Sequence, residues 1–255
     1  MAGAVVTPGF AKQRSELPWL PYESLDRVII NSHNFNPSYL YPSLRTTPPV
    51  LGYYPRFDAG AAATDQFTAD GSQDGTLRNG ATRADSSGLA YSFTAASSQY
   101  IDCTVPSGLS GATDCTIAFW AKKAATGDDL AIGTRIASTS GVWLQWFSDN
   151  VLYFSPRNGG FSSAAASVTF STAWRHVCGV KQGTNIRAYI NGALIASSTG
   201  PANLPSLSVF NIGRLETGGF YSNGLIDDPL IFTRALDATD VGYLAAQRGA
   251  IYATA

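Results

Sequence analysis

The chain of 255 residues is 45% hydrophobic and only 14% charged, with a formal net charge of −1 at pH 7. Its 17 basic and 18 acidic side chains form no basic cluster beyond Lys122-Lys123, so the positive patch that binds nucleic acids or anionic membranes is missing. The length accommodates one large all-β domain with an appendage, or two small domains.

Residues 1–51 differ in composition from the rest of the chain. Seven of the 13 prolines fall here and would interrupt any long helix or central strand. The first ten residues hold no basic residue and too short an apolar run for a signal peptide, so we expect no Sec export. The segment also holds aromatic residues, which disordered tails lack: Phe10, Trp19, Tyr22, Phe35, Tyr39 and Tyr41. We expect an extended arm whose aromatic side chains bind a partner surface.

From Tyr53 onward, short apolar runs alternate with clusters of Gly, Asn, Asp and Ser, a spacing typical of an antiparallel sandwich or jelly roll. The expected strands are 89–93, 98–105, 115–123, 130–136, 142–147, 151–155, 167–170, 174–181, 186–190, 193–197, 207–213 and 224–232. Only Asp237–Arg248 has apolar residues at helical spacing. The sequence therefore predicts an all-β domain with a short C-terminal helix.

Two local patterns give details of this sheet. In Cys115–Trp120 both alternating sets of side chains are apolar, which predicts a central strand covered on both faces. Asn191-Gly192 lies between two apolar-alternating runs, and this dipeptide is the strongest short-range hairpin signal because a type I′ turn needs positive φ at both central residues. The chain is therefore expected to form antiparallel sheet around residue 191.

The three cysteines, Cys103, Cys115 and Cys178, lie within strand-like runs. We expect them to be buried, reduced thiols, with a Cys103–Cys115 or Cys115–Cys178 disulfide as the alternative. The two histidines, His33 and His176, do not have metal-ligand spacing with each other or with a cysteine. His176 lies in a predicted strand, where a buried or half-buried structural histidine is expected.

Four motifs occur in order in the C-terminal half: Trp174–Val177 (WRHV), Tyr189–Gly192 (YING), Asn211–Gly213 (NIG) and Gly224–Asp228 (GLIDD). Together they resemble the laminin-G-like, concanavalin A-like jelly-roll family, over about residues 53–248. The resemblance implies a two-sheet antiparallel jelly-roll sandwich for residues 52–255. Residues 1–51 lie outside it as the extended N-terminal arm.

Many members of this family hold a structural Ca²⁺, a cation that binds several oxygen ligands. The resemblance therefore suggests a calcium site formed by Asp227 and Asp228 together with Asp70 and Asp74. The upstream segment departs from the family pattern, because Phe67 replaces the usual acidic residue. The alternative is that these aspartates cap turns in their own backbone or pair with a neighbouring arginine.

The resemblance does not extend to catalysis. Glycoside hydrolases with this fold carry glutamates in an E-x-D-x-E arrangement, and hydrolysis of a glycosidic bond needs a pair of carboxyl groups. The chain contains only Glu16, Glu23 and Glu216, and no such arrangement. We therefore expect a protein that is not an enzyme.

Carbohydrate binding is compatible with the implied fold, because aromatic faces stack on sugar rings. The candidates are Trp143, Trp146, Tyr153, Phe161 and Tyr221, which lie near predicted strand ends or loops. The alternative is that these rings fill the core. Trp143 and Trp146 are three residues apart in a strand and point to opposite faces, which leaves room for one of them to be exposed.

Two classes of function fit these features. The first, favoured by the arm and by the lack of a signal peptide, is a structural protein of a bacteriophage virion, such as a capsid decoration, head-fibre or tail component. Its arm would bind other virion proteins or copies of the same chain in a homo-oligomer. The alternative is an extracellular carbohydrate- or glycoprotein-binding module, and cell-surface glycans are compatible partners in both classes. Fold alone does not separate them.

Overall fold

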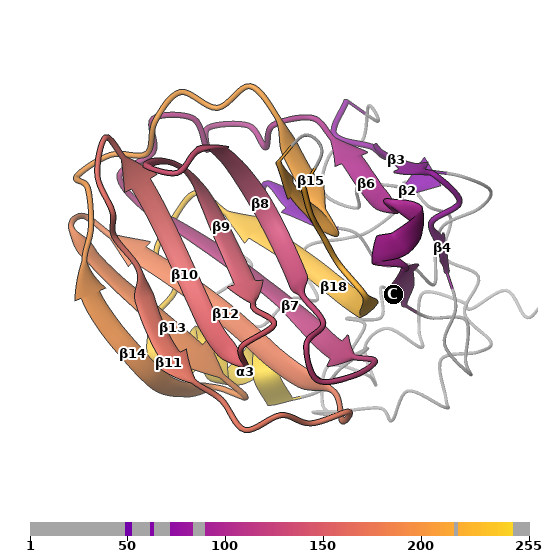
Figure 1. Cartoon of the computed structure of the whole chain (residues 1–255). Coiled ribbons are helices and arrows are strands. Elements are labelled where there is room, and N and C mark those ends of the chain that lie inside the picture. The colour runs from indigo at the N-terminus through magenta and orange to yellow at the C-terminus, as the bar shows by residue number, and fades with distance from the viewer. Residues whose placement is uncertain (1–48, 53–61, 64–71, 84–89, 217–218, 247–255) are drawn as a thin grey trace, which may run out of the picture.

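The computed structural model describes residues 49–52, 62–63, 72–83, 90–216 and 219–246 (Figure 1). These residues form two antiparallel sheets packed face to face, a two-stranded ribbon and one α-helix, which confirms the predicted two-sheet sandwich. Within these ranges no helix is long and apolar enough to cross a membrane. The predicted arm residues from Phe10 to Tyr41 lie outside the described part of the chain.

The strands are arranged as follows. Across the first sheet the order is β14 (Ala193–Thr199), β13 (Asn185–Ile190), β12 (Arg175–Gln182), β7 (Cys115–Lys123), β18 (Gly224–Phe232), β5 (Tyr91–Phe93) and β4 (Thr82–Arg83), and β1 (Leu51–Gly52) pairs with β18 off this path. Across the second sheet, nearer the viewer in Figure 1, the order is β11 (Ala164–Ser167), β10 (Val151–Asn158), β9 (Ser140–Trp146), β8 (Leu130–Ala137), β15 (Phe210–Ile212), β6 (Tyr100–Cys103), β3 (Gly75–Arg78) and β2 (Ala62–Ala63). The ribbon is β16 (Arg214–Glu216) with β17 (Gly219–Tyr221), the helix is α3 (Ala238–Ala246), and Ala95–Ser97 form a 3₁₀ turn.

Most predicted strands are confirmed, with ends that differ by a few residues. The exception is the predicted strand 167–170, because β11 instead ends at Ser167 and pairs Ala164–Ser167 with the start of β10. The short strands β1 to β4, β16 and β17 were not predicted, since runs this short give no readable alternation. The predicted C-terminal helix is confirmed as α3 up to Ala246, where the described residues end.

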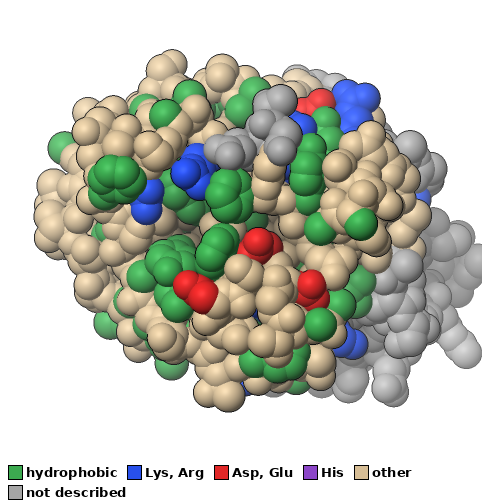
Figure 2. All heavy atoms as spheres, in the orientation of Figure 1, with side chains coloured by type: hydrophobic (Ala, Val, Ile, Leu, Met, Phe, Trp, Pro, Cys, Tyr) green, Lys and Arg blue, Asp and Glu red, His purple; other side chains and the backbone are tan. Residues whose placement is uncertain are grey.

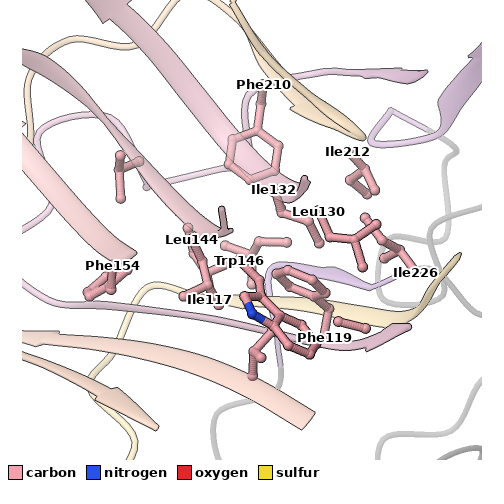
Figure 3. Close-up of a cluster of buried hydrophobic side chains, with 14 of the residues drawn as sticks. Ile117, Phe119, Leu130, Ile132, Leu144, Trp146, Phe154, Phe210, Ile212 and Ile226 are labelled. Carbon is pink, nitrogen blue, oxygen red and sulfur yellow. The ribbon is translucent and has the colours of Figure 1, made fainter. Parts of the chain in front are cut away.

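The main core lies between the two sheets and is built from the inward residues of each alternating strand. Ile117 and Phe119 of β7 and Ile226 of β18 lie opposite Trp146 of β9 and Phe154 of β10 (Figure 3). All five side chains are fully buried. Burial of one large apolar side chain contributes about 1.5–3 kcal/mol, so the contact between the sheets supplies the main stabilisation of the fold.

The outer side of the first sheet is covered by α3, which explains why β7 is apolar on both faces. Ala118 of β7 and Val180 of β12 belong to a buried cluster with Val241 and Leu244 of the helix. β7 lies between β12 and β18 in the sheet. The prediction that Cys115–Trp120 forms a central strand covered on both faces is therefore confirmed.

The predicted Asn-Gly turn joins β13 to β14. Asn191 and Gly192 have φ values of 49° and 82°, the positive values that this tight turn requires. Asn191 also fixes the hairpin to β12, because its backbone N–H donates to the carbonyl of His176 (2.7 Å) and its Oδ1 accepts from the backbone N–H of His176 (2.9 Å). The turn residue thus links three strands of the first sheet.

The three cysteines are buried and form no disulfide, as predicted. Burial raises the pKa of the Cys115 thiol from 9.0 to about 12. Because the thiolate is the reactive form of cysteine, this thiol is protonated and unreactive at neutral pH. Cys115 and Cys178 act as small apolar side chains in the packing of the first sheet.

His176 is the buried histidine that the strand pattern predicts. It is 2% exposed, and its ring meets the Trp120 ring edge-on with a centroid distance of 5.4 Å. Burial lowers the pKa of His176 from 6.5 to about 3. The imidazole is therefore neutral in the folded protein over the physiological range of pH.

The burial of His176 predicts that the free energy of unfolding depends on pH. The folded pKa of His176 lies below the unfolded value, so stability is fully present above pH 6.5 and is lost as the pH falls toward 3. We expect His176 to remove about 2 kcal/mol of unfolding free energy between pH 7 and pH 5. His176→Phe, which keeps a buried ring beside Trp120, should lack this part of the pH dependence in urea unfolding at both pH values. An equal pH dependence in the two proteins would contradict a neutral, buried imidazole.

At Gly179 of β12 the two sheets approach each other closely. A Cβ atom at this position would lie 2.2 Å from Cδ2 of Phe154. The Phe154 ring is fully buried and comes from β10 in the opposite sheet. Glycine is required here because the ring lies directly against the backbone of β12.

Gly179→Ala should lower the free energy of unfolding by about 1–3 kcal/mol, because the added methyl group overpacks the core. Phe154→Leu in the same chain should recover part of that loss by making room for the methyl group. Gly160→Ala serves as the control, since no atom lies within 4 Å of a Cβ at that position. Chemical denaturation measures all three variants, and a Gly179→Ala variant as stable as the parent would rule out this packing.

Candidate functional site

The outer side of the second sheet carries a surface of mixed chemistry. In the orientation of Figure 1 this side faces the viewer, and Figure 2 shows hydrophobic side chains gathered there beside cationic and acidic ones. Because alternate residues of β8, β9 and β10 fill the core, the residues between them point outward. We name the surface formed by Arg135, Trp143, Arg157, Phe161 and Phe220 the arginine–aromatic face.

The register of three strands brings the two arginines together. Gly141 of β9 pairs with Arg135 of β8 on one side and with Arg157 of β10 on the other. Gly141 has a φ of 139°, and a Cβ atom there would lie 2.3 Å from the carbonyl oxygen of Thr134, so no other residue fits. Since the middle residue has no side chain, the two arginine side chains can converge over β9.

Both guanidinium groups pack against Trp143, which lies two residues further along β9. The distance from the Trp143 ring centroid to Cζ is 4.7 Å for Arg157 and 6.0 Å for Arg135. Trp143 is only 4% exposed and also packs against Leu215 of the ribbon. A cation–π contact contributes about 0.5–2 kcal/mol, so Trp143 acts as a platform that holds both cations.

Arg157 also holds the loop between β10 and β11. It donates hydrogen bonds to the carbonyl of Ser162 (3.2 Å), the carbonyl of Ser138 (2.6 Å) and the hydroxyl of Ser163 (3.0 Å). Burial lowers the pKa of Arg157, and the nearby charge of Arg135 lowers it further. The two cations are thus close enough to repel each other, and neutral oxygens hold Arg157 in place.

Phe161 lies at the edge of this face and is 75% exposed, the highest value among the large hydrophobic side chains that the structure describes. Its ring centroid lies 5.1 Å from Cζ of Arg157. Gly159 and Gly160 precede it, and neither has another residue's atoms within 4 Å of a Cβ placed there. The loop therefore presents a flat apolar ring to solvent directly beside a cation.

An acidic group lies next to the face, at the opposite end of β10 from Arg157, and we name it the acidic end. Tyr153 of β10 donates a hydrogen bond to Asp149 (3.2 Å), and the Phe147 ring meets the Tyr153 ring edge-on at 6.1 Å. Burial raises the pKa of Tyr153, and the charge of Asp149 adds to the shift. Tyr153 precedes Arg157 by four residues in the same strand, so about 13 Å separates the acidic end from the cationic end.

A buried lysine fixes the turn that carries Asp149. The side chain of Lys123, the last residue of β7, is fully buried, and its Nζ donates to the carbonyl of Phe147 (2.6 Å) and to Oδ1 of Asn150 (3.3 Å). The same nitrogen lies 4.7 Å from the ring centroid of Trp146. Burial lowers the pKa of Lys123 to about 8, although nearby aspartates oppose the shift. This contact ties the turn to the first sheet.

The ribbon β16–β17 closes one side of the face. Leu215 packs on Ala131 of β8, and Phe220 packs against the same cluster with its ring centroid 4.8 Å from Cζ of Arg135. Ser222 fixes the ribbon, because its Oγ accepts a hydrogen bond from the backbone N–H of Ala131 (3.0 Å). The ribbon therefore holds Phe220 in a fixed position beside Arg135.

A second pairing of a cation with aromatic rings lies between the ribbon and β6. Tyr221 of β17 and Tyr100 of β6 have ring centroids 6.3 Å apart. Arg214 lies over the Tyr100 ring at 3.6 Å and donates a hydrogen bond to Oδ1 of Asn211 (3.0 Å). The same combination of arginine and aromatic ring thus recurs on this side of the second sheet.

The five aromatic residues predicted to bind carbohydrate differ in their exposure to solvent. Phe161, Tyr153 and Tyr221 are at least partly exposed on the outer side of the second sheet. Trp146 is fully buried in the main core, so its assignment to a binding surface is wrong. Trp143 does point outward, but the two arginines and the ribbon cover it, so neither tryptophan is exposed.

The predicted calcium ligands lie in different surroundings. Asp227 and Asp228 are buried in β18, where the pairing with β7 shifts register, and the backbone N–H of Asp228 donates to Oδ1 of Asp227 (2.9 Å). Asp74 immediately precedes β3, and Asp70 lies outside the described residues. In the part of the chain that the structure describes, no group of three or more His, Cys, Asp or Glu side chains is placed to hold a metal ion. Calcium binding stays a prediction.

The sequence analysis missed Arg135, Arg157 and Phe220 as members of the site. A signal for Arg135 was present, since it alternates with core residues of the predicted strand 130–136, whereas Arg157 lies beyond the end of the predicted strand 151–155. For Phe220 the only signal was the pair Gly218-Gly219 just before it, a dipeptide that is common in tight turns. Nothing in the sequence indicated that these residues converge on Trp143.

The two packed antiparallel sheets define a jelly-roll domain. The family model described as the concanavalin A-like lectin/glucanases superfamily, a laminin G type, matches residues 94–242. The chain therefore belongs to this superfamily, which confirms the family resemblance of its sequence motifs. Among curated proteins, none matches the chain in sequence.

Solved structures of similar fold include binding domains of botulinum neurotoxins. The serotype G binding domain has a TM-score of 0.58 and 17% identity, with 77% of this chain and 50% of that chain covered. The binding domain of neurotoxin DC, solved in complex with SialylT, has a TM-score of 0.57 and 15% identity, with the same coverage of 77% and 50%. The chain thus spans about half the length of these domains, and the likeness at this identity concerns the fold.

Proposed function

We propose that this domain is a non-catalytic carbohydrate-binding module and that its site is the arginine–aromatic face with the acidic end at Tyr153. The superfamily includes both lectins and glucanases. The sequence lacks the E-x-D-x-E arrangement of the hydrolases with this fold, which favours the lectin class. Among proteins of similar fold, the structure of botulinum neurotoxin type C concerns cell entry dependent upon interaction with two ganglioside molecules.

The observation that carries this proposal is the exposed ring of Phe161 beside Arg157. An isolated apolar ring that is 75% exposed gains stabilisation when the apolar face of a sugar covers it. The arginine and serine side chains beside Phe161, and Asp149 at the acidic end, supply donors and acceptors for sugar hydroxyl groups. Binding surfaces of this kind combine aromatic contact area with a few polar groups that fix orientation.

Binding of the full-length protein to an immobilised panel of oligosaccharides tests this function. Phe161→Ala should reduce affinity for any bound oligosaccharide by about tenfold, because the stacking surface is lost. Leu194→Ala is the matched control, since Leu194 is 54% exposed but lies in β14 of the other sheet. If no oligosaccharide binds, or if both variants bind like the parent, carbohydrate recognition by this face is excluded.

We further propose that the whole chain is a structural protein of a virion that displays this domain outward and is anchored through residues 1–51. The proline- and aromatic-rich composition of that segment supports the proposal, because an extended chain with exposed rings can fill grooves on neighbouring subunits. In the alternative setting, an extracellular binding module, the same face would bind glycans or glycoproteins. The two settings differ in what residues 1–51 bind.

Deletion of residues 1–50 separates the two settings. In the virion setting, the truncated protein should keep the cooperative unfolding transition of the sandwich but should no longer copurify with assembled particles. A variant with Phe10, Trp19 and Tyr22 changed to alanine should show a partial loss, because these rings are the expected anchors. Normal incorporation of the truncated protein into particles would remove the anchoring role.

A further inference from the structure

We propose that the preferred ligand of the arginine–aromatic face is an anionic oligosaccharide, whose carboxylate or sulfate group binds between Arg135 and Arg157. This inference rests on the proposed carbohydrate-binding function and specifies the chemistry of its ligand. The two arginines occupy one row of the sheet and are separated only by Gly141. Both guanidinium groups lie within 6.0 Å of the Trp143 ring centroid, so they are held on the same side of the sheet.

The placement of two like charges against the same tryptophan ring favours an anion. Burial lowers the pKa of Arg157, and the positive charge of Arg135 lowers it further. All three hydrogen bonds of the Arg157 side chain go to uncharged oxygens of serine residues. An anion bound between the guanidinium groups would remove this repulsion, and the gain is largest where the site is partly shielded from water.

Arg157 has enough N–H donors to bind such a ligand. An arginine side chain has five N–H donors, and Arg157 uses three of them in the contacts with Ser138, Ser162 and Ser163. Carboxylate and sulfate groups accept paired hydrogen bonds from guanidinium groups in a planar fork, which an ammonium group does not reproduce. Arg157 therefore keeps donors for an anion while it holds the loop that carries Phe161.

The charge distribution also fixes the direction of the ligand. The cationic end lies at Arg157 and Phe161, and the acidic end lies at Tyr153 and Asp149, about 13 Å away along β10. A ligand with its anionic group at the acidic end would be repelled by Asp149. The anionic sugar is thus expected beside Phe161, with neutral sugars extending toward Tyr153, where their hydroxyl groups can donate to Asp149.

The test uses an array in which each neutral oligosaccharide is matched by a sulfated form and a carboxylated form of the same backbone. The full-length protein should bind at least one anionic form about tenfold more tightly than its neutral parent at low salt, and the difference should shrink in 0.5 M NaCl. The sulfated and carboxylated forms separate the two sources of charge, and preference for either supports the inference. Tighter or equal binding of the neutral forms overturns it and leaves carbohydrate binding intact, whereas no binding to any form overturns the proposed function itself.

Four variants locate the charge selectivity. Arg135→Gln should bring the affinity for the anionic form close to that for its neutral parent, while the variant still unfolds in a single cooperative transition. Arg157→Lys keeps the charge but lacks the planar fork, so it should lose part of the preference, and Arg157→Gln should lose all of it. Arg187→Gln is the control, because it removes the same charge from β13 in the first sheet, where Arg187 donates to Gln182. If Arg187→Gln lowers the preference as much as Arg135→Gln does, the selectivity comes from net charge and the proposed site is wrong.

Discussion

The alternation of side chains along each strand, held in place by burial between the two sheets, determines both the core and the outer face. In β9, Leu144 and Trp146 are fully buried on the inner side, which places Gly141 and Trp143 on the outer side. A shift of one residue would exchange the two sets and expose the large core side chains, so the hydrophobic contact holds the register. The meeting of Arg135 and Arg157 over Gly141 depends on this register.

On the outer face, the few charged side chains of this chain hold loops in place. Arg157 lies between the rings of Trp143 and Phe161 and donates only to neutral oxygens. At the opposite end, Lys123 is buried beneath the turn of Asp149 and donates to the Phe147 carbonyl and the Asn150 side chain. Both cations organise loops while the face keeps one positive and one negative end, a polarity that a ligand can recognise.

Different residues determine the fold and the candidate site of this protein. Botulinum neurotoxin binding domains have a similar fold at 15–17% identity, so the architecture does not depend on most of the particular side chains of this chain. The core contacts, such as the Phe154 ring against Gly179, constrain only the inward positions. Strands β8, β9 and β10 and the loop after β10 are therefore free to carry a surface particular to this chain.

The amino-acid sequence by itself determined the fold class, because alternation, the Asn191-Gly192 turn and the ordered motifs after Trp174 each depend on neighbouring residues only. It also indicated that His176 and the cysteines are buried. Only the tertiary structure decided which outward residues meet, since Arg135, Trp143 and Arg157 come from three strands whose register is set by the whole core. Trp146 shows the limit most clearly: alternation placed it opposite Trp143, but contact between the sheets decided that its side is the inside.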